Sequence, residues 1–234
     1  MHKVFFAEPK QEIIDLKNAS FVCNGISPEP FRLTAAAGGL VEGNVPMICG
    51  GSHSNWERSL ARRECYSLKN KKWKHVFNLK LARKYVGTGS VVINGKLLVN
   101  GGEESRWSKK QTELVSADGT DLAHDMPKPG VGHCNIKLNE STILIAASSR
   151  FSPFSQTYFQ NVLTGDVIQG PMIKKARSFR PRHGPGLSPS CGLVNFGNKP
   201  HAIYVDGREK KVYALDLNDL TRGWKMNSYS KFKS

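Results

Sequence analysis

Short apolar runs separated by polar turns recur along this chain, and they predict strands rather than helices. The run VPMIC ends in Gly50-Gly51, and the run KLLVN ends in Gly101-Gly102, 51 residues later (101 − 50). Each glycine pair is followed by a polar loop, a short strand-like run (ECYSL or TELVS), a turn and another strand. Strands at this spacing predict an all-β repeat. No stretch keeps an apolar spacing of three and four residues over three turns, so we expect few helices.

Two weaker copies of this unit follow. The third contains STILIAASS, YFQNV and the turn LTGD, and the fourth contains HAIYVDGRE and KVYALDL. Near the N-terminus, EIIDLKNASFVC is similar to ECYSLKNKKWKH, which supplies the outer two strands of the first full unit. We therefore predict a single repeat domain over residues 1–234. It comprises an outer half-unit, four fuller units and a tail, at about 1–30, 31–80, 81–129, 130–177, 178–226 and 227–234.

This pattern resembles the kelch repeat, over residues 12–226. The kelch unit has about fifty residues, with a Gly-Gly pair ending its second strand. A Tyr lies on the third strand, a Trp follows it, and an Arg often opens the next unit. The fourth unit has Asp206-Gly207 in place of the glycine pair. The residues that carry the resemblance are Gly50, Gly51, Tyr66, Trp73, Arg83, Gly101, Gly102, Arg177, Gly207, Tyr213 and Trp224.

The resemblance implies an all-β, kelch-type β-propeller, in which four-stranded blades fan around an axis. The glycines would allow positive φ and close approach of backbones at the exit of the second strand. Tyr66 and Trp73 would pack between blades, and Arg83 would bind carbonyls in the same seam. About four blades plus an outer half-blade do not close a ring comfortably. Two alternatives stay open: a part of a larger propeller, or a five-bladed ring in which the N-terminal strands join the last unit.

Charge adds a preference for acidic partners. The chain has 34 Lys and Arg against 19 Asp and Glu, which gives a net charge of +15, and its apolar fraction of 39% is typical of a globular protein. A field of this sign attracts acidic proteins or polyanions. Basic residues concentrate at 69–84 and 174–183, which we predict to be loops or strand ends. The alternative for each cluster is an ordinary solvated surface.

The cysteines and the N-terminus bear on the compartment. The five cysteines show no CxxC spacing, so we expect mostly buried, reduced thiols. No window approaches the roughly 18 apolar residues of a membrane span. Residues 1–30 lack the features of a signal peptide, which favours a cytoplasmic protein, with an extracellular one as the alternative.

Candidate chemistry is sparse. The seven histidines are well separated, and no G-x-S-x-G, HExxH or phosphate-loop motif is present. Galactose oxidase-like enzymes place copper on this fold, and His133 and Cys134 could meet His183 and Cys191 near the axis. Filling of the axis is the commoner role for such residues. We therefore expect no catalytic residue, no metal and no cofactor.

The sequence favours a non-catalytic scaffold that binds another protein through its loops, and the net positive charge favours an acidic partner. Trp and Arg are enriched where interfaces gain most of their energy. The residues that we expect to contact a partner are Trp56, Arg58, Trp107, Lys174, Lys175, Arg180 and Arg182. Binding of a nucleic acid or a heparin-like polyanion through the basic stretches is the alternative. A galactose oxidase-like enzyme is a third and weaker one.

Overall fold

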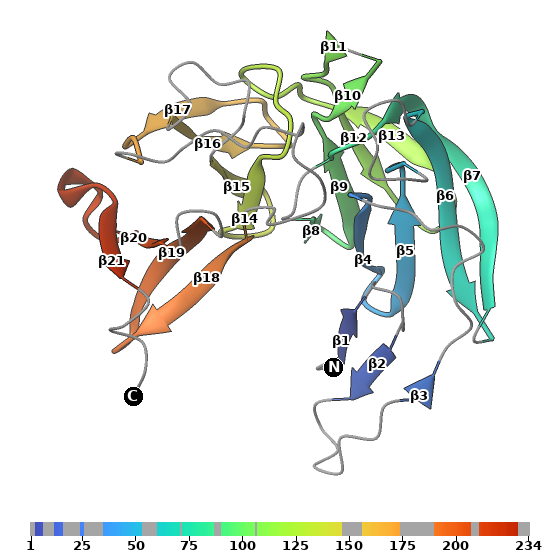
Figure 1. Ribbon diagram of the computed structural model, residues 1–234, viewed down its shortest axis with the longest axis horizontal. Coiled ribbons are helices and arrows are strands. Elements are labelled where there is room, and N and C mark those ends of the chain that lie inside the picture. Colours follow the sequence, from blue (N-terminus) through green and yellow to red (C-terminus); the bar gives the residue numbers. More distant parts are fainter. Residues whose placement is uncertain are drawn as a thin grey trace.

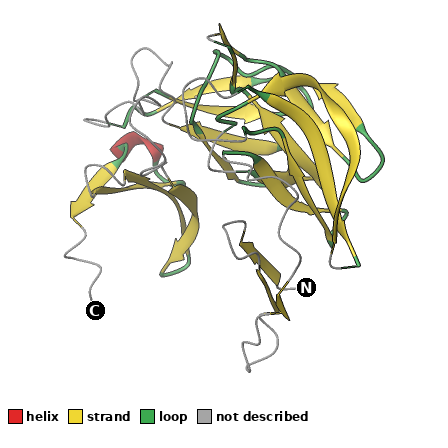
Figure 2. Cartoon of the chain, turned by 45° about the vertical axis from the view of Figure 1, so that its right-hand side comes forward, coloured by secondary structure: helices red, strands yellow, loops and turns green. Residues whose placement is uncertain are grey.

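The computed structural model is built of strands (Figure 1). Its described part contains no α-helix, and a 3-10 turn at Leu220–Arg222 is its single helical element (Figure 2). The prediction of an all-β chain is therefore confirmed. None of the described helical structure is long and apolar enough to cross a membrane. The structure describes residues 3–6, 12–15, 24–25, 35–52, 60–70, 72–86, 90–105, 107–146, 156–173, 190–206 and 211–228.

Sixteen of the strands form four antiparallel sheets of four strands each. In every sheet the strands pair in chain order, as expected when short turns join neighbouring strands. The first sheet contains β4 (Ala37–Val41), β5 (Val45–Cys49), β6 (Arg62–Lys69) and β7 (Lys72–Arg83). The second contains β8 (Val91–Ile93), β9 (Lys96–Asn100), β12 (Thr112–Val115) and β13 (Thr120–Ala123).

The other two sheets repeat this order. The third contains β14 (Cys134–Lys137), β15 (Thr142–Ala146), β16 (Thr157–Asn161) and β17 (Val167–Gly170). The fourth contains β18 (Ser190–Phe196), β19 (Lys199–Asp206), β20 (Lys211–Asp216) and β21 (Lys225–Ser228). A short hairpin of β10 (Glu103–Glu104) and β11 (Trp107–Ser108) is inserted between β9 and β12.

The first strands of the four sheets lie next to one another. β4 contacts β8, β8 contacts β14, and β14 contacts β18. Figure 1 shows the sheets following one another around an arc, from the first sheet on the right to the fourth on the left. This succession, with the first strands innermost, is consistent with a β-propeller. Among the described strands, none from one end of the chain joins a sheet at the other end.

The structure differs from the predicted units at the N-terminus and at two boundaries between units. The N-terminal residues form a three-stranded sheet of β1 (Lys3–Phe6), β2 (Glu12–Asp15) and β3 (Asn24–Gly25), whereas the sequence predicted the two outer strands of a unit. In addition, β7 continues past residue 80 and β21 continues past residue 226. The basic stretch at 69–84, predicted as loops or strand ends, is therefore largely strand, with Lys69, Lys72 and Arg83 at strand ends.

The core lies between successive sheets and follows the two-residue period of strands. Leu97 and Val99 on β9 pack with Met47 of the first sheet. Leu98, between them in sequence, packs with Ile143 and Ile145 of the third sheet. A third cluster joins the third and fourth sheets and includes Ile136, Leu144, Tyr204, Tyr213 and Trp224.

Tyr66 and Trp73 pack together on one face of the first sheet. Both are buried, but their cluster contains Ile48, Ala36 and Leu68, which all belong to the first unit. Cys65, the residue before Tyr66, packs toward the second sheet. Successive residues of a strand point to opposite faces. Within the described residues, Tyr66 and Trp73 therefore cover the face of the first sheet that points away from its neighbour.

Four of the five cysteines are paired, so the expectation of mostly reduced thiols was wrong. Cys49 and Cys65 form a disulfide between the directly opposed positions of β5 and β6. Cys134 and Cys191 form a second disulfide, which links the innermost strands β14 and β18 of the third and fourth sheets. The fifth cysteine, Cys23, lies outside the described residues.

Candidate partner-binding face

One end of the sheets holds the connections from β9 to β12 and between successive sheets. In an antiparallel sheet with strands in chain order, the connection after the second strand and the connection after the fourth lie at the same end. We call residues 50–52, 84–86, 101–105, 107–111 and 124–133 of these connections the loop end. The tight turns at 42–44, 94–95, 116–119 and 197–198 lie at the opposite end.

The paired glycines form the inner layer of the loop end. Gly50, Gly51, Gly101 and Gly102 all have positive φ, between 61° and 88°. A Cβ atom on Gly102 would lie 2.8 Å from the carbonyl oxygen of Lys84, which is closer than contacts of real Cβ atoms. Glycine is therefore needed here both for its backbone conformation and for the close approach of a neighbouring backbone.

A buried ion pair joins the first two sheets just beneath these glycines. The Arg83 guanidinium, at the end of β7, donates from Nη2 to Oε1 of Glu113 on β12 over 2.9 Å, and both side chains are fully buried. Arg83 Nη1 also donates to the carbonyl oxygens of Gly101 and Gln111, over 2.8 and 2.7 Å. Burial lowers the pKa of Arg83, and the hydrogen bond that its guanidinium donates to Glu113 opposes that shift. The guanidinium therefore ties the exit of β9 to the start of β12.

The carboxylate of Glu113 is satisfied from its other side. Its Oε2 accepts hydrogen bonds from the backbone N–H of Lys80 over 2.7 Å and from the hydroxyl of Thr120 over 3.0 Å. A buried ion pair is tolerated only when its remaining atoms are hydrogen-bonded, as they are here. Glu113 was not predicted as a functional residue, although an acidic residue inside the short apolar strand TELV pointed to a buried partner.

The β10–β11 hairpin rises from this layer and is anchored at its base. Glu103 and Lys84 exchange two backbone hydrogen bonds, over 2.9 and 3.0 Å, and their side chains form a largely buried ion pair of 3.6 Å. At the other strand, the N–H of Lys109 donates to the carbonyl of Gly102, and the N–H of Gly130 donates to the carbonyl of Lys109. Connections from two neighbouring sheets thus hold the hairpin.

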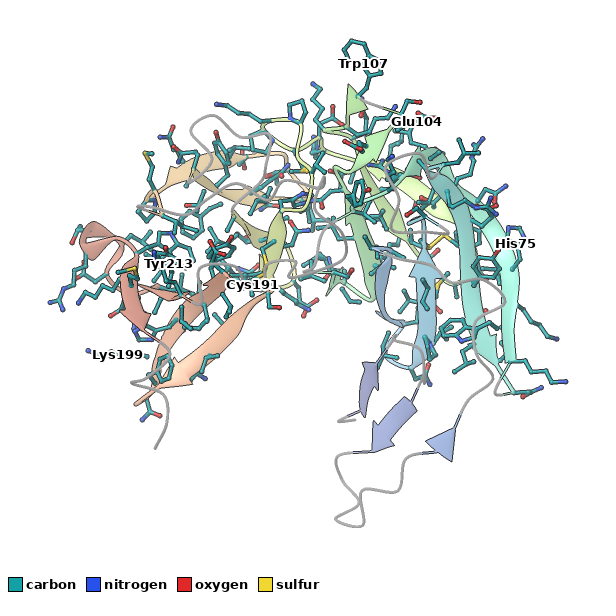
Figure 3. All side chains as sticks on the ribbon, in the orientation of Figure 1. His75, Glu104, Trp107, Cys191, Lys199 and Tyr213 are labelled. Atoms are coloured by element: carbon teal, nitrogen blue, oxygen red, sulfur yellow. A yellow bond between two sulfur atoms is a disulfide. The ribbon has the colours of Figure 1, made fainter. Side chains whose placement is uncertain are left out.

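Trp107 is displayed on this hairpin. It pairs across the hairpin with Glu104, and 79% of its surface is exposed. Figure 3 shows its side chain pointing away from the body of the molecule, beyond Glu104. The Glu104 carboxylate in turn forms an ion pair with Lys109, with Nζ 2.8 Å from Oε2. An anchored hairpin therefore presents a large aromatic side chain to solvent with a charged pair at its base.

A buried polar network lies between the second and third sheets near the same end. The Nε2 of His133 is 2.8 Å from the amide oxygen of Asn100, and the side-chain amides of Asn100 and Asn135 bind each other. The other ring nitrogen, Nδ1, is buried and makes no hydrogen bond in the described structure. Burial, followed by the positive charge of Arg83, lowers the pKa of His133 to about 4.

This shift predicts acid sensitivity. In the unfolded chain the imidazole titrates near its ordinary pKa of about 6.5, so the unfolded state binds the proton more readily than the folded state. The stability contributed by neutral His133 is complete above pH 6.5 and is lost as the pH falls toward 4, by about 3 kcal/mol in all. Urea unfolding at a series of pH values measures this loss. His133→Gln should show a flatter profile between pH 6.5 and 4, and an unchanged slope would contradict the assignment.

Several residues expected to bind a partner lie outside the described part of the chain. Trp107 is the one that the structure places, and it lies at the loop end. Arg83 and Lys84, from the basic stretch at 69–84, are buried and paired, so they cannot bind a partner as expected of surface residues. The undescribed residues are Trp56, Arg58, Lys174, Lys175, Arg180 and Arg182, together with the repeat residues Arg177 and Gly207.

No group of three metal-binding side chains converges among the described residues. Cys134 and Cys191 lie on the innermost strands β14 and β18 and are joined as a disulfide. Their sulfur atoms are thus bonded to each other and are not thiolate ligands. His133, the residue before Cys134, has one ring nitrogen hydrogen-bonded to Asn100.

A pocket of about 290 Å³ lies away from the loop end, on the fourth sheet. Phe196 and His201 stack edge to face at its wall, with ring centroids 5.2 Å apart. Asp216, Arg222 and Lys225 complete its charged lining. Arg222 is already paired with Asp219 at 2.7 Å, so a ligand would have to compete for its charge.

Together these features define an all-β protein of repeated four-stranded antiparallel sheets, consistent with a β-propeller. No family model and no curated protein matches the chain. The chain matches 153 chains of solved structures. Because the architecture is this common, similarity to any one of them does not indicate a function for this chain. The structure of YjhT is similar, with a TM-score of 0.71 at 10% identity over 93% of this chain and 77% of the YjhT chain. At that identity the likeness shows the fold alone.

Proposed function

We propose that this chain is a kelch-type β-propeller that binds another protein through its loop end and does not catalyse a reaction. The four sheets supply four blades, and the N-terminal strands belong to a further, incomplete blade. Positive φ at all four paired glycines and the Arg83 contacts to carbonyls beside them support the kelch assignment. They match the roles that these residues have in the repeat.

The exposure of Trp107 is the observation that carries the binding role. Tryptophan is enriched among the residues that contribute most to protein interfaces, because it buries a large, rigid surface at low entropic cost. A tryptophan held on an anchored hairpin loses little further freedom on binding. Trp107 would insert into an apolar pocket of the partner. Acidic groups at the rim of that pocket would complement the net positive charge of the chain.

Replacing Trp107 by alanine tests this role. We expect at least a tenfold loss of affinity for the partner, in line with the cost of about 2 kcal/mol or more for a residue at the centre of an interface. Crosslinking followed by mass spectrometry identifies proteins bound to the wild-type chain, and titration then gives their affinities. Ile168→Ala is the matched control, because Ile168 is 70% exposed but lies on β17, away from the loop end.

The two variants separate the possible outcomes. A partner that is lost with Trp107→Ala and kept with Ile168→Ala supports the proposal. Equal affinity of every identified partner for Trp107→Ala and the wild type would contradict it. Both variants remove surface side chains, so their thermal denaturation should match that of the wild type. The galactose oxidase-like alternative is not favoured by any observation on the described residues.

A further inference from the structure

A cluster of lysines lies at the turn between β6 and β7, at the end of the first sheet opposite the loop end. Lys69 is the last residue of β6, and Lys72 and Lys74 lie on β7, in the sequence KNKKWK. All three are exposed, and β7 is the outermost strand of its sheet (Figure 1). We call Lys69, Lys72 and Lys74 the lysine cluster.

The register of the hairpin places like charges together. Lys69 is directly opposite Lys72, and Lys74 is opposite Ser67. Like charges at directly opposed positions of two strands destabilise the pair. In the described structure none of the three lysines forms an ion pair, whereas other surface cations do, such as Lys96 with Asp121 and Lys137 with Glu140. The cluster therefore keeps an unfavourable repulsion that a bound anion would relieve.

The cluster is also held in a fixed geometry. Trp73, between Lys72 and Lys74, is 8% exposed and packs with Leu68 and Tyr66 beneath the hairpin. Because residues two apart on a strand lie roughly 6.7 Å from each other, Lys72 and Lys74 present charges at a regular spacing. A row of cations at this spacing on a packed strand fits a chain of repeating anionic groups better than a single anion.

The two disulfides narrow the class of polyanion. Disulfides form and persist in oxidising compartments and are rare in the cytosol. The pairs Cys49–Cys65 and Cys134–Cys191 therefore favour an extracytosolic setting, in which sulfated polysaccharides are available and nucleic acids are scarce. We propose that the lysine cluster is a binding site for a sulfated polysaccharide. This inference goes beyond the protein-binding role and does not depend on it.

Heparin is the probe, with a nucleic acid of similar length as the comparison. Lys72→Glu combined with Lys74→Glu should weaken heparin binding by about tenfold or more at low salt and reduce the salt slope by about two. The matched control is Lys199→Glu with Lys225→Glu, which lie on the exposed surface of the fourth sheet. Each pair changes the formal charge by −4, from +15 to +11, so only position differs. Lys225 also lines the pocket, so the control tests that rival site.

A third variant separates loss of binding from loss of folding. Lys69→Glu replaces the opposed Lys69–Lys72 pair by an attractive one, so it should raise the melting temperature while it weakens heparin binding. A lower melting temperature together with weaker binding would contradict the repulsion argument. Equal loss of heparin binding in the cluster pair and the control pair would overturn the site, because net charge or the pocket on the fourth sheet would then account for as much of the binding. Tighter binding of the nucleic acid than of heparin would overturn the proposed class.

Discussion

Arg83→Ala is expected to lower the free energy of unfolding by about 3–5 kcal/mol, the usual cost of removing one partner from a buried ion pair. The substitution leaves the Glu113 carboxylate buried without its cation. The hydrogen bonds from Lys80 and Thr120 remain, but they compensate only part of the charge. The carbonyls of Gly101 and Gln111 also lose the guanidinium donor, although Gln111 keeps the N–H of Gly101 at 3.3 Å. Equilibrium unfolding in urea, followed by circular dichroism of the strands, measures the effect.

Two further variants make this prediction specific. Arg63→Ala is the control, because Arg63 is an exposed arginine on β6 that also donates to backbone carbonyls, those of Leu79 and Lys80. It should cost less than about 1 kcal/mol. Arg83→Met combined with Glu113→Leu removes both charges and should recover much of the lost stability, since an apolar pair carries no desolvation penalty. A cost for Arg83→Ala no larger than that for Arg63→Ala would show that the pair does not hold the first two sheets together.

The order of strands could be predicted from the sequence because local residue patterns mark where strands end. The glycine pairs mark where the second strand ends, and positive φ at Gly50 and Gly101 follows from local chain geometry alone. The same local information places Trp107 on a connection after the second strand. It does not reveal the β10–β11 hairpin, whose anchoring comes from Lys84 and Gly130, residues of two other connections.

Features that depend on how sheets face each other were beyond the sequence. The alternation of a strand separates Cys65 from Tyr66, but it does not say which face meets the next sheet. The face of the first sheet on which Tyr66 packs could therefore not be predicted from the sequence. Register shifts in the pairing of β6 with β7 add to the difficulty, because a bulge changes which residues share a face.

Long-range pairs were missed for the same reason. Glu113 is 30 residues from Arg83, and the two meet only because β12 and the end of β7 flank the same seam. Cys134 and Cys191 are 57 residues apart and meet because the third and fourth sheets bring β14 beside β18. Sequence spacing without CxxC motifs contains no information on either contact. The prediction of reduced thiols was wrong because it could not take these long-range contacts into account.

Removal of the Cys134–Cys191 disulfide is expected to have the second large effect. A disulfide stabilises the folded state because it removes conformational entropy from the unfolded chain. For the 57-residue separation of Cys134 and Cys191 this stabilisation is about 4 kcal/mol, against about 3 kcal/mol for the 16-residue separation of Cys49 and Cys65. Cys134→Ala with Cys191→Ala should therefore lower the unfolding free energy more than Cys49→Ala with Cys65→Ala. Urea unfolding of both variants, compared with the wild type in oxidised and reduced buffer, gives the two values.

The location of the damage distinguishes the two bonds. Cys134–Cys191 crosses the interface between the third and fourth sheets, whose core includes Ile136 and Tyr204. Its loss should raise amide hydrogen exchange in β18–β21 and leave β4–β7 protected, since the first sheet has its own disulfide and core. The Cys49–Cys65 variant should show the reverse pattern. Uniform loss of protection across all four sheets in both variants would mean that the sheets unfold as one cooperative unit. The Cys134–Cys191 disulfide would then not stabilise the fourth sheet more than the others.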